Sequence, residues 1–369
     1  MNFYDEIQKY NWEEVSEQIY TQSSADVKIA LAKNRLELSD FQALISPAAR
    51  PYLELMAQKS MQLTQKRFGK TIQFFIPLYL SNACTNTCVY CGFNHNNNFD
   101  RKILTKEEVI DEAKKISDLG FEHILLVTGE DNHRCGVSYI GEMMQVVKKY
   151  FSLVSIEVQP LKTEEYKELS KHGLNTVYVY QETYNETNYK KYHPTGRKSN
   201  YRYRLETPER LGEAGVHKIG LGCLLGLEDW RVDSFFTALH LQFLEKTYWK
   251  TKYSISFPRL RPHAGKYEPD HTTSQKDLLQ LICAYRLFNE QVEISLTTRE
   301  SPAFRDNMLK LGVTTFSAGS KTNPGGYAGG ESLEQFSVND DRSPQEIADM
   351  IKRNGYEVVW KDWDSFMQL

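Results

Sequence analysis

Three of the six cysteines in this 369-residue chain, Cys84, Cys88 and Cys91, lie within eight positions of one another. A structural zinc site takes four protein ligands, usually as two pairs, and the other three cysteines are scattered singly. A cluster of four irons can be held by three thiolates, which leaves one iron open to an external ligand. The triplet therefore favours an iron-sulfur site over two alternatives, which are incidental cysteines and a zinc knuckle completed by His95.

The chain after residue 75 alternates short apolar runs with longer stretches of helical periodicity, and eight such runs are present. Helical periodicity is clear over residues 105–119, 163–172 and 274–289. Eight repeats of a strand followed by a helix predict a closed (β/α)8 TIM barrel, with an open doubly wound sheet as the alternative. The runs are IPLYLS (76–81), HILLVTG (123–129), LVSIEV (153–158), TVYVYQ (176–181), KIGLGCLL (218–225), YSISFP (253–258), VEISLTT (292–298) and VTTFSA (313–318).

Helical segments are expected at both ends of this α/β barrel. Before it, Ser46-Pro47 and Gly69 mark the start and the end of the clearer of two helical stretches. After it, Ser343 and Glu346 have the spacing of a capping box that begins a last helix. The expected organisation is an N-terminal helical extension over 1–70, the barrel over 71–330 and a C-terminal helical tail over 331–369.

The cysteine triplet directly follows the first predicted strand, and barrel enzymes carry their chemistry on loops that leave the C-terminal ends of strands. The pattern Cys84-x3-Cys88-x2-Cys91, followed by Gly92-Phe93, resembles the signature of the radical S-adenosylmethionine (SAM) superfamily. The resemblance implies a 4Fe-4S cluster on the three cysteines, with SAM on the open iron. It also implies cleavage of SAM to a 5'-deoxyadenosyl radical, which takes a hydrogen atom from the substrate.

Three further residues match positions that bind SAM in this superfamily. Thr128-Gly129-Glu130 resembles the glycine-glycine-glutamate motif, with threonine in place of the first glycine, and implies that Glu130 binds the methionyl amine. By the same resemblance, Glu182 binds the ribose hydroxyls and Arg204 binds the SAM carboxylate, a task that suits a guanidinium fork. The alternative for each is an ordinary charged residue at the surface.

Four other segments resemble the aromatic amino acid lyases of the superfamily, and among them the tyrosine lyases of thiamine biosynthesis. That family cleaves the Cα–Cβ bond of L-tyrosine to dehydroglycine, which enters the thiazole ring, and p-cresol. The resemblance extends from residue 76 to about 330 and is more specific than the triplet. The segments are YHPTGRK (192–198), FPRLRP (257–262), SLTTRE (295–300) and FSAGSKTNPGGY (316–327).

The resemblance also assigns residues to the amino acid substrate. Arg299 follows the seventh predicted strand, and a guanidinium there can hold an amino acid carboxylate through two parallel hydrogen bonds. Ser317 and Ser320, after the eighth strand, add hydroxyl contacts to the same carboxylate, and Tyr90 contacts the substrate amine. For the two serines the alternative is loop capping, and for Tyr90 it is packing against the cluster.

Composition excludes several classes of partner. A net charge of -3 and a pI near 6.3 give no basic surface for nucleic acid. The chain has no run of about 18 apolar residues and no apolar leader, so we expect neither a membrane nor export, and we expect a cytoplasmic enzyme. The resemblance implies a reduced flavodoxin or ferredoxin-type electron donor, and a thiazole synthase as a partner.

Three alternative functions stay open at this level. The tyrosine lyase that matures iron hydrogenases carries a second cluster on a cysteine-containing C-terminal extension, and this chain has no cysteine after Cys283. A tryptophan lyase is the second alternative, since the residues named above do not separate phenol from indole recognition. The third is a non-catalytic iron-sulfur sensor that binds SAM without turnover.

Overall fold

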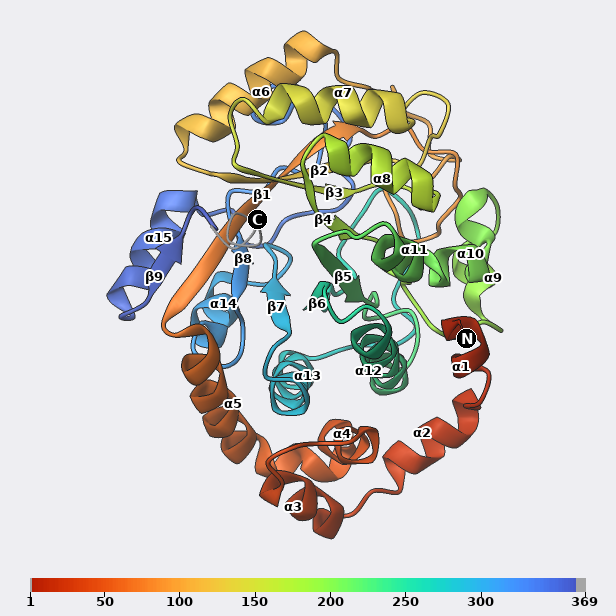
Figure 1. Ribbon diagram of the computed structural model, residues 1–369, viewed down its shortest axis with the longest axis vertical. Helices are drawn as coiled ribbons and strands as arrows, with labels where there is room; N and C mark the ends of the chain where they lie inside the picture. Colours follow the sequence, from red (N-terminus) through yellow and green to blue (C-terminus); the bar gives the residue numbers. More distant parts are fainter. Residues whose placement is uncertain (1, 363–369) are drawn as a thin grey trace.

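The computed structural model describes residues 2–362 and contains a closed barrel of eight parallel strands (Figure 1). The strand order is β2-β3-β4-β5-β6-β7-β8-β1, and pairing between β1 and β2 closes the ring. The barrel prediction is confirmed, and the open sheet is wrong. The strands are β1 (Thr71–Ser81), β2 (His123–Thr128), β3 (Leu153–Glu157), β4 (Leu174–Tyr178), β5 (Lys218–Gly222), β6 (Lys252–Ser256), β7 (Glu293–Leu296) and β8 (Thr315–Ser317).

Strand β1 pairs with two different strands along one edge. Its C-terminal part pairs with β2, whereas Thr71–Gln73 pair in parallel with a ninth strand, β9 (Glu357–Val359). The sequence analysis missed β9 because three partly exposed residues give too short a pattern. The helix before it, α15 (Pro344–Arg353), begins at the predicted capping box, in which Ser343 and Glu346 exchange hydrogen bonds.

Helices cover the outside of the barrel, and their apolar faces bury the outward side chains of the strands. The three helices predicted from periodicity are present as α6, α8 and α13, within one residue of the expected bounds. The helices after β1 are α6 (Lys106–Asp118), α7 (Val137–Val147), α8 (Thr163–Lys171), α9 (Tyr189–Tyr192), α10 (Tyr201–Leu205), α11 (Thr207–Glu213), α12 (Trp230–Thr247), α13 (Gln275–Phe288) and α14 (Pro302–Met308), with a 3-10 turn at Arg197–Ser199.

The N-terminal segment wraps around α12 and α13 (Figure 1). The Phe3 ring stacks on His240 of α12 at a centroid distance of 3.7 Å. From α13, Gln280 Nε2 donates to the carbonyl oxygens of Leu44 and Ser46 at 2.9 and 2.8 Å. These contacts make the segment an outer cover of the barrel. Its helices are α1 (Phe3–Ile7), α2 (Trp12–Tyr20), α3 (Ser24–Ala32), α4 (Leu38–Ile45) and α5 (Leu53–Phe68).

One expected helix start differs from the structure. The helix predicted to begin after Ser46 starts as a 3-10 turn at Pro47–Tyr52 and becomes α-helical only in α5. Pro51 lies inside that turn and has no N–H to donate, which disfavours a continuous α-helix. The Ser46 hydroxyl donates to the Ala43 carbonyl oxygen instead of capping the turn.

Apolar and aromatic side chains line the barrel interior toward the C-terminal ends of the strands, beside the cavity described below. None of the helices within residues 2–362 combines the length and the apolar character needed to cross a lipid bilayer. The interior cluster consists of Phe75, Tyr79, Phe93, Leu125, Val127 and Tyr178.

Candidate active site

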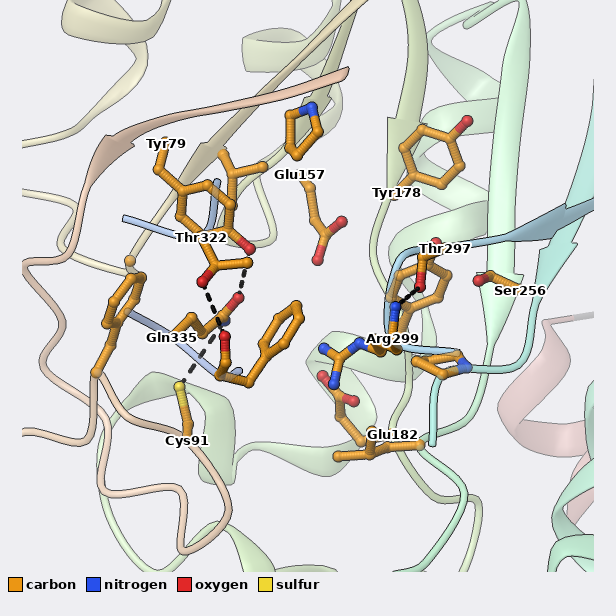
Figure 2. Close-up of a pocket in the computed structure, with 18 of the residues that line it drawn as sticks. Tyr79, Cys91, Glu157, Tyr178, Glu182, Ser256, Thr297, Arg299, Thr322 and Gln335 are labelled. Atoms are coloured by element: carbon orange, nitrogen blue, oxygen red, sulfur yellow. Dashed lines mark hydrogen bonds between the residues drawn. The ribbon is translucent and has the colours of Figure 1, made fainter. Parts of the chain in front are cut away.

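The cysteine triplet lies on the loop between β1 and α6, at the C-terminal end of the barrel. Arg101 holds the shape of this loop, because its guanidinium donates to the carbonyl oxygens of Asn82, Phe93 and Asn94 at 3.1, 2.7 and 2.7 Å. These bonds leave the three thiols lining one cavity inside the mouth of the barrel. Figure 2 shows one of the three, Cys91, with the Gln335 amide nitrogen 3.8 Å from its sulfur.

Burial controls the chemistry of the three thiols. It raises the pKa of Cys84 to about 11, and it raises the pKa values of Cys88 and Cys91 as well. Buried thiolates therefore need nearby positive charge, which coordinated metal supplies. Within residues 2–362, no three His, Cys, Asp or Glu side chains are placed to hold a single metal ion, and the His95 ring bonds the Cys84 carbonyl instead. Among these residues, His95 is therefore not placed beside the three thiols as a fourth zinc ligand.

Gly129 allows the end of β2 to lie against the cysteine loop. A Cβ atom on Gly129 would be 2.2 Å from the Ala83 carbonyl oxygen, so a larger residue would force the two segments apart. Thr128, in the place of the first glycine of the resembled motif, keeps its side chain 3.5 Å from Gln159. The threonine therefore fits, and Glu130 follows directly in the cavity wall.

Glu130, Glu182 and Arg204 lie together in one buried charge network. Arg204 Nη1 donates to Glu130 at 2.8 Å, and Nη2 lies 3.6 Å from Glu182. Lys198 Nζ is 2.6 Å from the same Glu182 oxygen, and Asn86 donates to the second Glu130 oxygen at 2.8 Å. Two cations thus balance two carboxylates. Burial would raise the pKa of Glu130, but Arg204 and Lys198 together hold it below its ordinary value.

Glu182 has an unusual backbone conformation. Its φ of 71° is the one positive value among the non-glycine residues of the described chain. This left-handed conformation costs free energy for a residue with a side chain, and such residues are concentrated at functional sites. The Leu224 N–H donates to the Glu182 carbonyl at 2.8 Å and holds the turn, which directs the Glu182 side chain into the cavity (Figure 2).

Arg299 extends into the same cavity from the loop after β7 (Figure 2). Its guanidinium carbon lies 3.4 Å from the centre of the Phe336 ring, and Nη1 donates to the Arg259 carbonyl oxygen at 3.3 Å. The neighbouring Glu300 pairs with Arg259, and within residues 2–362 no carboxylate forms an ion pair with Arg299. Arg299 is therefore a half-buried cation without an ion-pair partner among the described residues, and the charges of Glu157 and Glu182 act on it within the cavity.

Two serines from the end of β8 line the cavity next to Arg299. The Ser317 hydroxyl accepts a hydrogen bond from the Thr298 N–H at 3.1 Å, so its own proton remains available to the cavity. The Ser320 hydroxyl is buried and has no hydrogen-bond partner within the described chain. A buried ion pair between Arg305 and Asp340 supports this region, because Arg305 also donates to the Ser317 carbonyl.

Tyr90 lies between two of the cysteines and bonds to a buried histidine. Its hydroxyl is 2.8 Å from His193 Nε2, and His193 Nδ1 is 2.9 Å from the Tyr189 carbonyl oxygen. A carbonyl only accepts, so Nδ1 carries the proton and Nε2 of the neutral ring accepts. Burial, with Lys198 nearby, lowers the pKa of His193 and keeps the ring neutral. Tyr90 must therefore donate to His193.

Three charged residues of the cavity, Lys198, Glu157 and Arg261, were not predicted as site residues from the sequence. Lys198 stands within the segment YHPTGRK, but only the fold shows that this loop returns to Glu182. Glu157 ends β3 and extends into the cavity. The sequence contained a signal for Glu157, which is a carboxylate within the apolar run LVSIEV. A charged residue at the C-terminal end of a barrel strand indicates function.

Comparison with known proteins agrees with this fold and site. Residues 78–239 match the radical SAM superfamily, and residues 256–357 match the biotin and thiamin synthesis associated domain. The chain is 47% identical to the 2-iminoacetate synthases of Escherichia coli and Salmonella typhimurium, over 99% of its length and 97% of theirs. The solved structure of the FeFe-hydrogenase maturase HydG from Carboxydothermus hydrogenoformans is 30% identical and superimposes with a TM-score of 0.85, over 97% of this chain and 82% of that one.

The closed barrel and its three-cysteine loop define a radical SAM enzyme. A 4Fe-4S cluster and SAM are the cofactors of this class. Within the class, the chain belongs to the 2-iminoacetate synthase family.

The residues of the cavity fit both cofactors. Burial raises the pKa values of the three thiols, although Lys198 lowers those of Cys88 and Cys91 in part, so a metal cluster would stabilise their thiolates. Close by, the balanced network of Glu130, Glu182, Arg204 and Lys198 offers both signs of charge to a molecule that carries an ammonium and a carboxylate.

Proposed function

We propose that this chain cleaves the Cα–Cβ bond of L-tyrosine to p-cresol and dehydroglycine (2-iminoacetate), the precursor of the thiamine thiazole ring. The observation that carries the proposal is the 47% identity with two 2-iminoacetate synthases along nearly the whole chain. The cavity supports it, because it joins three thiols to an unpaired half-buried arginine. A radical that forms beside the thiols would therefore meet an anion that Arg299 holds.

Cys84, Cys88 and Cys91 would hold the cluster, and Glu130, Glu182 and Arg204 would hold SAM. When bound, the two cofactors supply the radical that starts carbon–carbon cleavage. The protein prepares their site in advance, because Arg204 Nε donates to the Tyr180 carbonyl at 2.6 Å and so fixes the guanidinium between the two glutamates. We add Lys198 to this set, since it directs Glu182 into the cavity.

Arg299 would bind the tyrosine carboxylate. Nη1 already bonds the Arg259 carbonyl, so the remaining N–H groups of the guanidinium are the ones available to the substrate. The free protons of the Ser317 and Ser320 hydroxyls would add hydrogen bonds to the same carboxylate. An anion bound there pairs a half-buried cation that otherwise lacks an ion-pair partner among the described residues, which stabilises the complex.

Tyr90 would accept a hydrogen bond from the substrate amine. Its own proton is used by His193, so the phenolic oxygen presents only lone pairs to the cavity. An amine N–H is the complementary donor. Arg299 and Tyr90 together would fix the orientation of the amine next to the cofactor site, and such placement contributes roughly 7–11 kcal/mol to the lowering of a barrier.

We also propose two protein partners, an electron donor and a thiazole synthase. An external one-electron donor of the flavodoxin or ferredoxin type would reduce the cluster, and a thiazole synthase would consume dehydroglycine. Six free cysteines and a reducible cluster suit a reducing compartment, so we place the enzyme in the cytoplasm.

Anaerobic reconstitution with iron, sulfide, SAM and dithionite tests the function. L-tyrosine should yield p-cresol, together with glyoxylate from the hydrolysis of dehydroglycine, and both products are measured by mass spectrometry. Turnover of tryptophan to the exclusion of tyrosine would overturn the substrate assignment. Tight SAM binding without any cleavage product would instead indicate a sensor.

A further inference from the structure

Glu157 is the acidic residue of the cavity that has no partner. Glu130 and Glu182 are held by Arg204 and Lys198, whereas the Glu157 carboxyl group makes no hydrogen bond or ion pair within residues 2–362. Figure 2 shows it extending into the centre of the cavity. Burial and the nearby Glu182 raise its pKa to about 7. Burying such a carboxyl group costs free energy unless a ligand supplies a hydrogen-bond donor to it.

The barrel places Glu157 and Arg299 on opposite walls. In the closed ring, β3 and β7 are four strands apart, so Glu157 at the end of β3 and Arg299 on the loop after β7 lie on opposite sides of the barrel mouth. Side chains alternate along β3, and Ser155, two residues before Glu157, bonds inside the barrel to His123 at 2.7 Å. Glu157 therefore points inward. The interior of an eight-stranded barrel accommodates one small ligand.

The space beside Glu157 suits an aromatic ring. Val127 is its register partner on β2, and Phe75, Leu125 and Tyr178 of the interior cluster also line the cavity. The hydroxyl of Tyr79, which lies nearby, is already donated to Gln335 at 2.8 Å. This part of the cavity thus combines apolar walls with one charged acceptor, which matches a ring that carries one hydroxyl.

We propose that Glu157 accepts a hydrogen bond from the phenolic hydroxyl of the substrate and thereby selects tyrosine over phenylalanine. The inference rests on the proposed function, and it names the residue that reads the substrate side chain. With the carboxylate of tyrosine on Arg299, the ring extends across the barrel and its hydroxyl reaches the far wall. Phenylalanine would fill the cavity but leave the half-buried Glu157 without a donor, which is the kind of mismatch that polar sites reject strongly.

The substrate amine is the other hydrogen-bond donor to compare with the phenolic hydroxyl as a partner of Glu157. In an α-amino acid, however, the amine and the carboxylate are attached to the same carbon. A carboxylate on Arg299 therefore holds the amine close to Arg299, and Tyr90, which lines the same cavity, offers it an acceptor. The phenolic hydroxyl is the substrate donor that lies farthest from Arg299.

Calorimetric binding tests the inference on protein loaded with its cluster and SAM but without reductant, so that no turnover occurs. The ligands are L-tyrosine, L-phenylalanine and 3-(4-hydroxyphenyl)propionate, which lacks the amine. Glu157→Leu removes the acceptor, and Glu157→Gln keeps an amide oxygen in its place. Glu164→Leu is the matched control, because Glu164 lies in the first turn of α8 with its side chain 80% exposed. Iron content and SAM affinity report whether each variant is folded.

The ratio of tyrosine to phenylalanine affinity should fall about 10- to 100-fold in Glu157→Leu, should fall less in Glu157→Gln and should stay unchanged in Glu164→Leu. Suppose that the wild-type protein cleaves tyrosine and the ratio of tyrosine to phenylalanine affinity is unchanged in both Glu157 variants. This result would overturn the inference about Glu157 but not the proposed function. A change confined to the ratio of tyrosine to 3-(4-hydroxyphenyl)propionate would assign Glu157 to the amine and would also overturn it. Wild-type protein that neither binds nor cleaves tyrosine would overturn both the inference and the proposed function.

Discussion

Replacing Arg299 with lysine keeps a positive charge in the cavity but removes the guanidinium fork. The fork makes two contacts with the protein, one with the Phe336 ring at 3.4 Å and one with the Arg259 carbonyl at 3.3 Å, and it leaves further N–H groups for the substrate. An ammonium cannot make all of these contacts from one position. The variant should therefore bind tyrosine through a single hydrogen bond.

The expected size of the effect follows from these contacts. A hydrogen bond to a charged group contributes roughly 1.5–3 kcal/mol, and part of the stacking on Phe336, about 0.5–1 kcal/mol, is lost with it. A loss of about 2–4 kcal/mol corresponds to a roughly 30- to 850-fold increase in the Kd for tyrosine. The proposed SAM site contains Arg204 rather than Arg299, so the affinity for SAM should not change.

Calorimetry on cluster-loaded protein, with SAM and without reductant, measures both affinities, and p-cresol formation gives kcat/KM. The matched control is Arg202→Lys on α10, where the side chain is 53% exposed. Wild-type tyrosine affinity in Arg299→Lys would refute the assignment of the carboxylate anchor. Equal weakening of tyrosine and SAM would show that the substitution disturbs the whole cavity rather than one contact.

Three further changes test other parts of the structure. Cys88→Ala should lower the iron content from about four per chain to near zero, whereas Cys283→Ala, in the outer core, should keep it. Asp340→Asn should lower the free energy of unfolding by about 3–5 kcal/mol, because it leaves the fully buried Arg305 without its counter-charge. Burial raises the pKa of Glu209 to about 7, so its contribution to stability is present below about pH 4.5 and is lost as the pH rises through 7. Between pH 5 and pH 8, the wild type should therefore lose up to about 3 kcal/mol more of its free energy of unfolding than Glu209→Gln loses.

Each of these three has a decisive measurement. Iron and sulfide analysis decides the first, and full iron in Cys88→Ala would contradict the cluster assignment. Urea denaturation decides the other two. A change below about 1 kcal/mol in Asp340→Asn, comparable with the loss of an exposed ion pair, would show that Arg305 finds another partner. If the free energy of unfolding had the same pH dependence in wild type and Glu209→Gln, then Glu209 would not contribute to stability at acidic pH.

The parts of the molecule that local sequence determines were predictable. The Thr105–Glu108 capping box marks the start of α6, and each strand of the barrel appears as a short apolar run. The three cysteines identify the cluster loop because their spacing is local. Gly129 was also predictable, because it matches a known motif. Only the structure shows why glycine is required there, since a Cβ atom would lie 2.2 Å from the Ala83 carbonyl oxygen.

The parts that depend on contacts between distant segments were not predictable. Lys198 reaches Glu182, and Tyr90 reaches His193 across 103 positions, only after the loops fold over the barrel mouth. Gln335 bonds Tyr79 from 256 positions away, and its segment has no periodic pattern. Glu157 gave a weak signal, because one acidic residue in an apolar run does not reveal which strand faces it.

The wrapping of the N-terminal helices around α12 and α13 affects how the chain folds during synthesis. Phe3 receives its stacking partner, His240, and the acceptor for its N–H, Glu209, only after more than 200 further residues have been made. Helices as short as α1–α4 are not stable alone in water. They are therefore made before the elements that they cover, and their apolar faces stay uncovered until α13 has been translated. A segment that is made this long before its packing partners exposes apolar surface during synthesis, and chaperones protect surface of that kind.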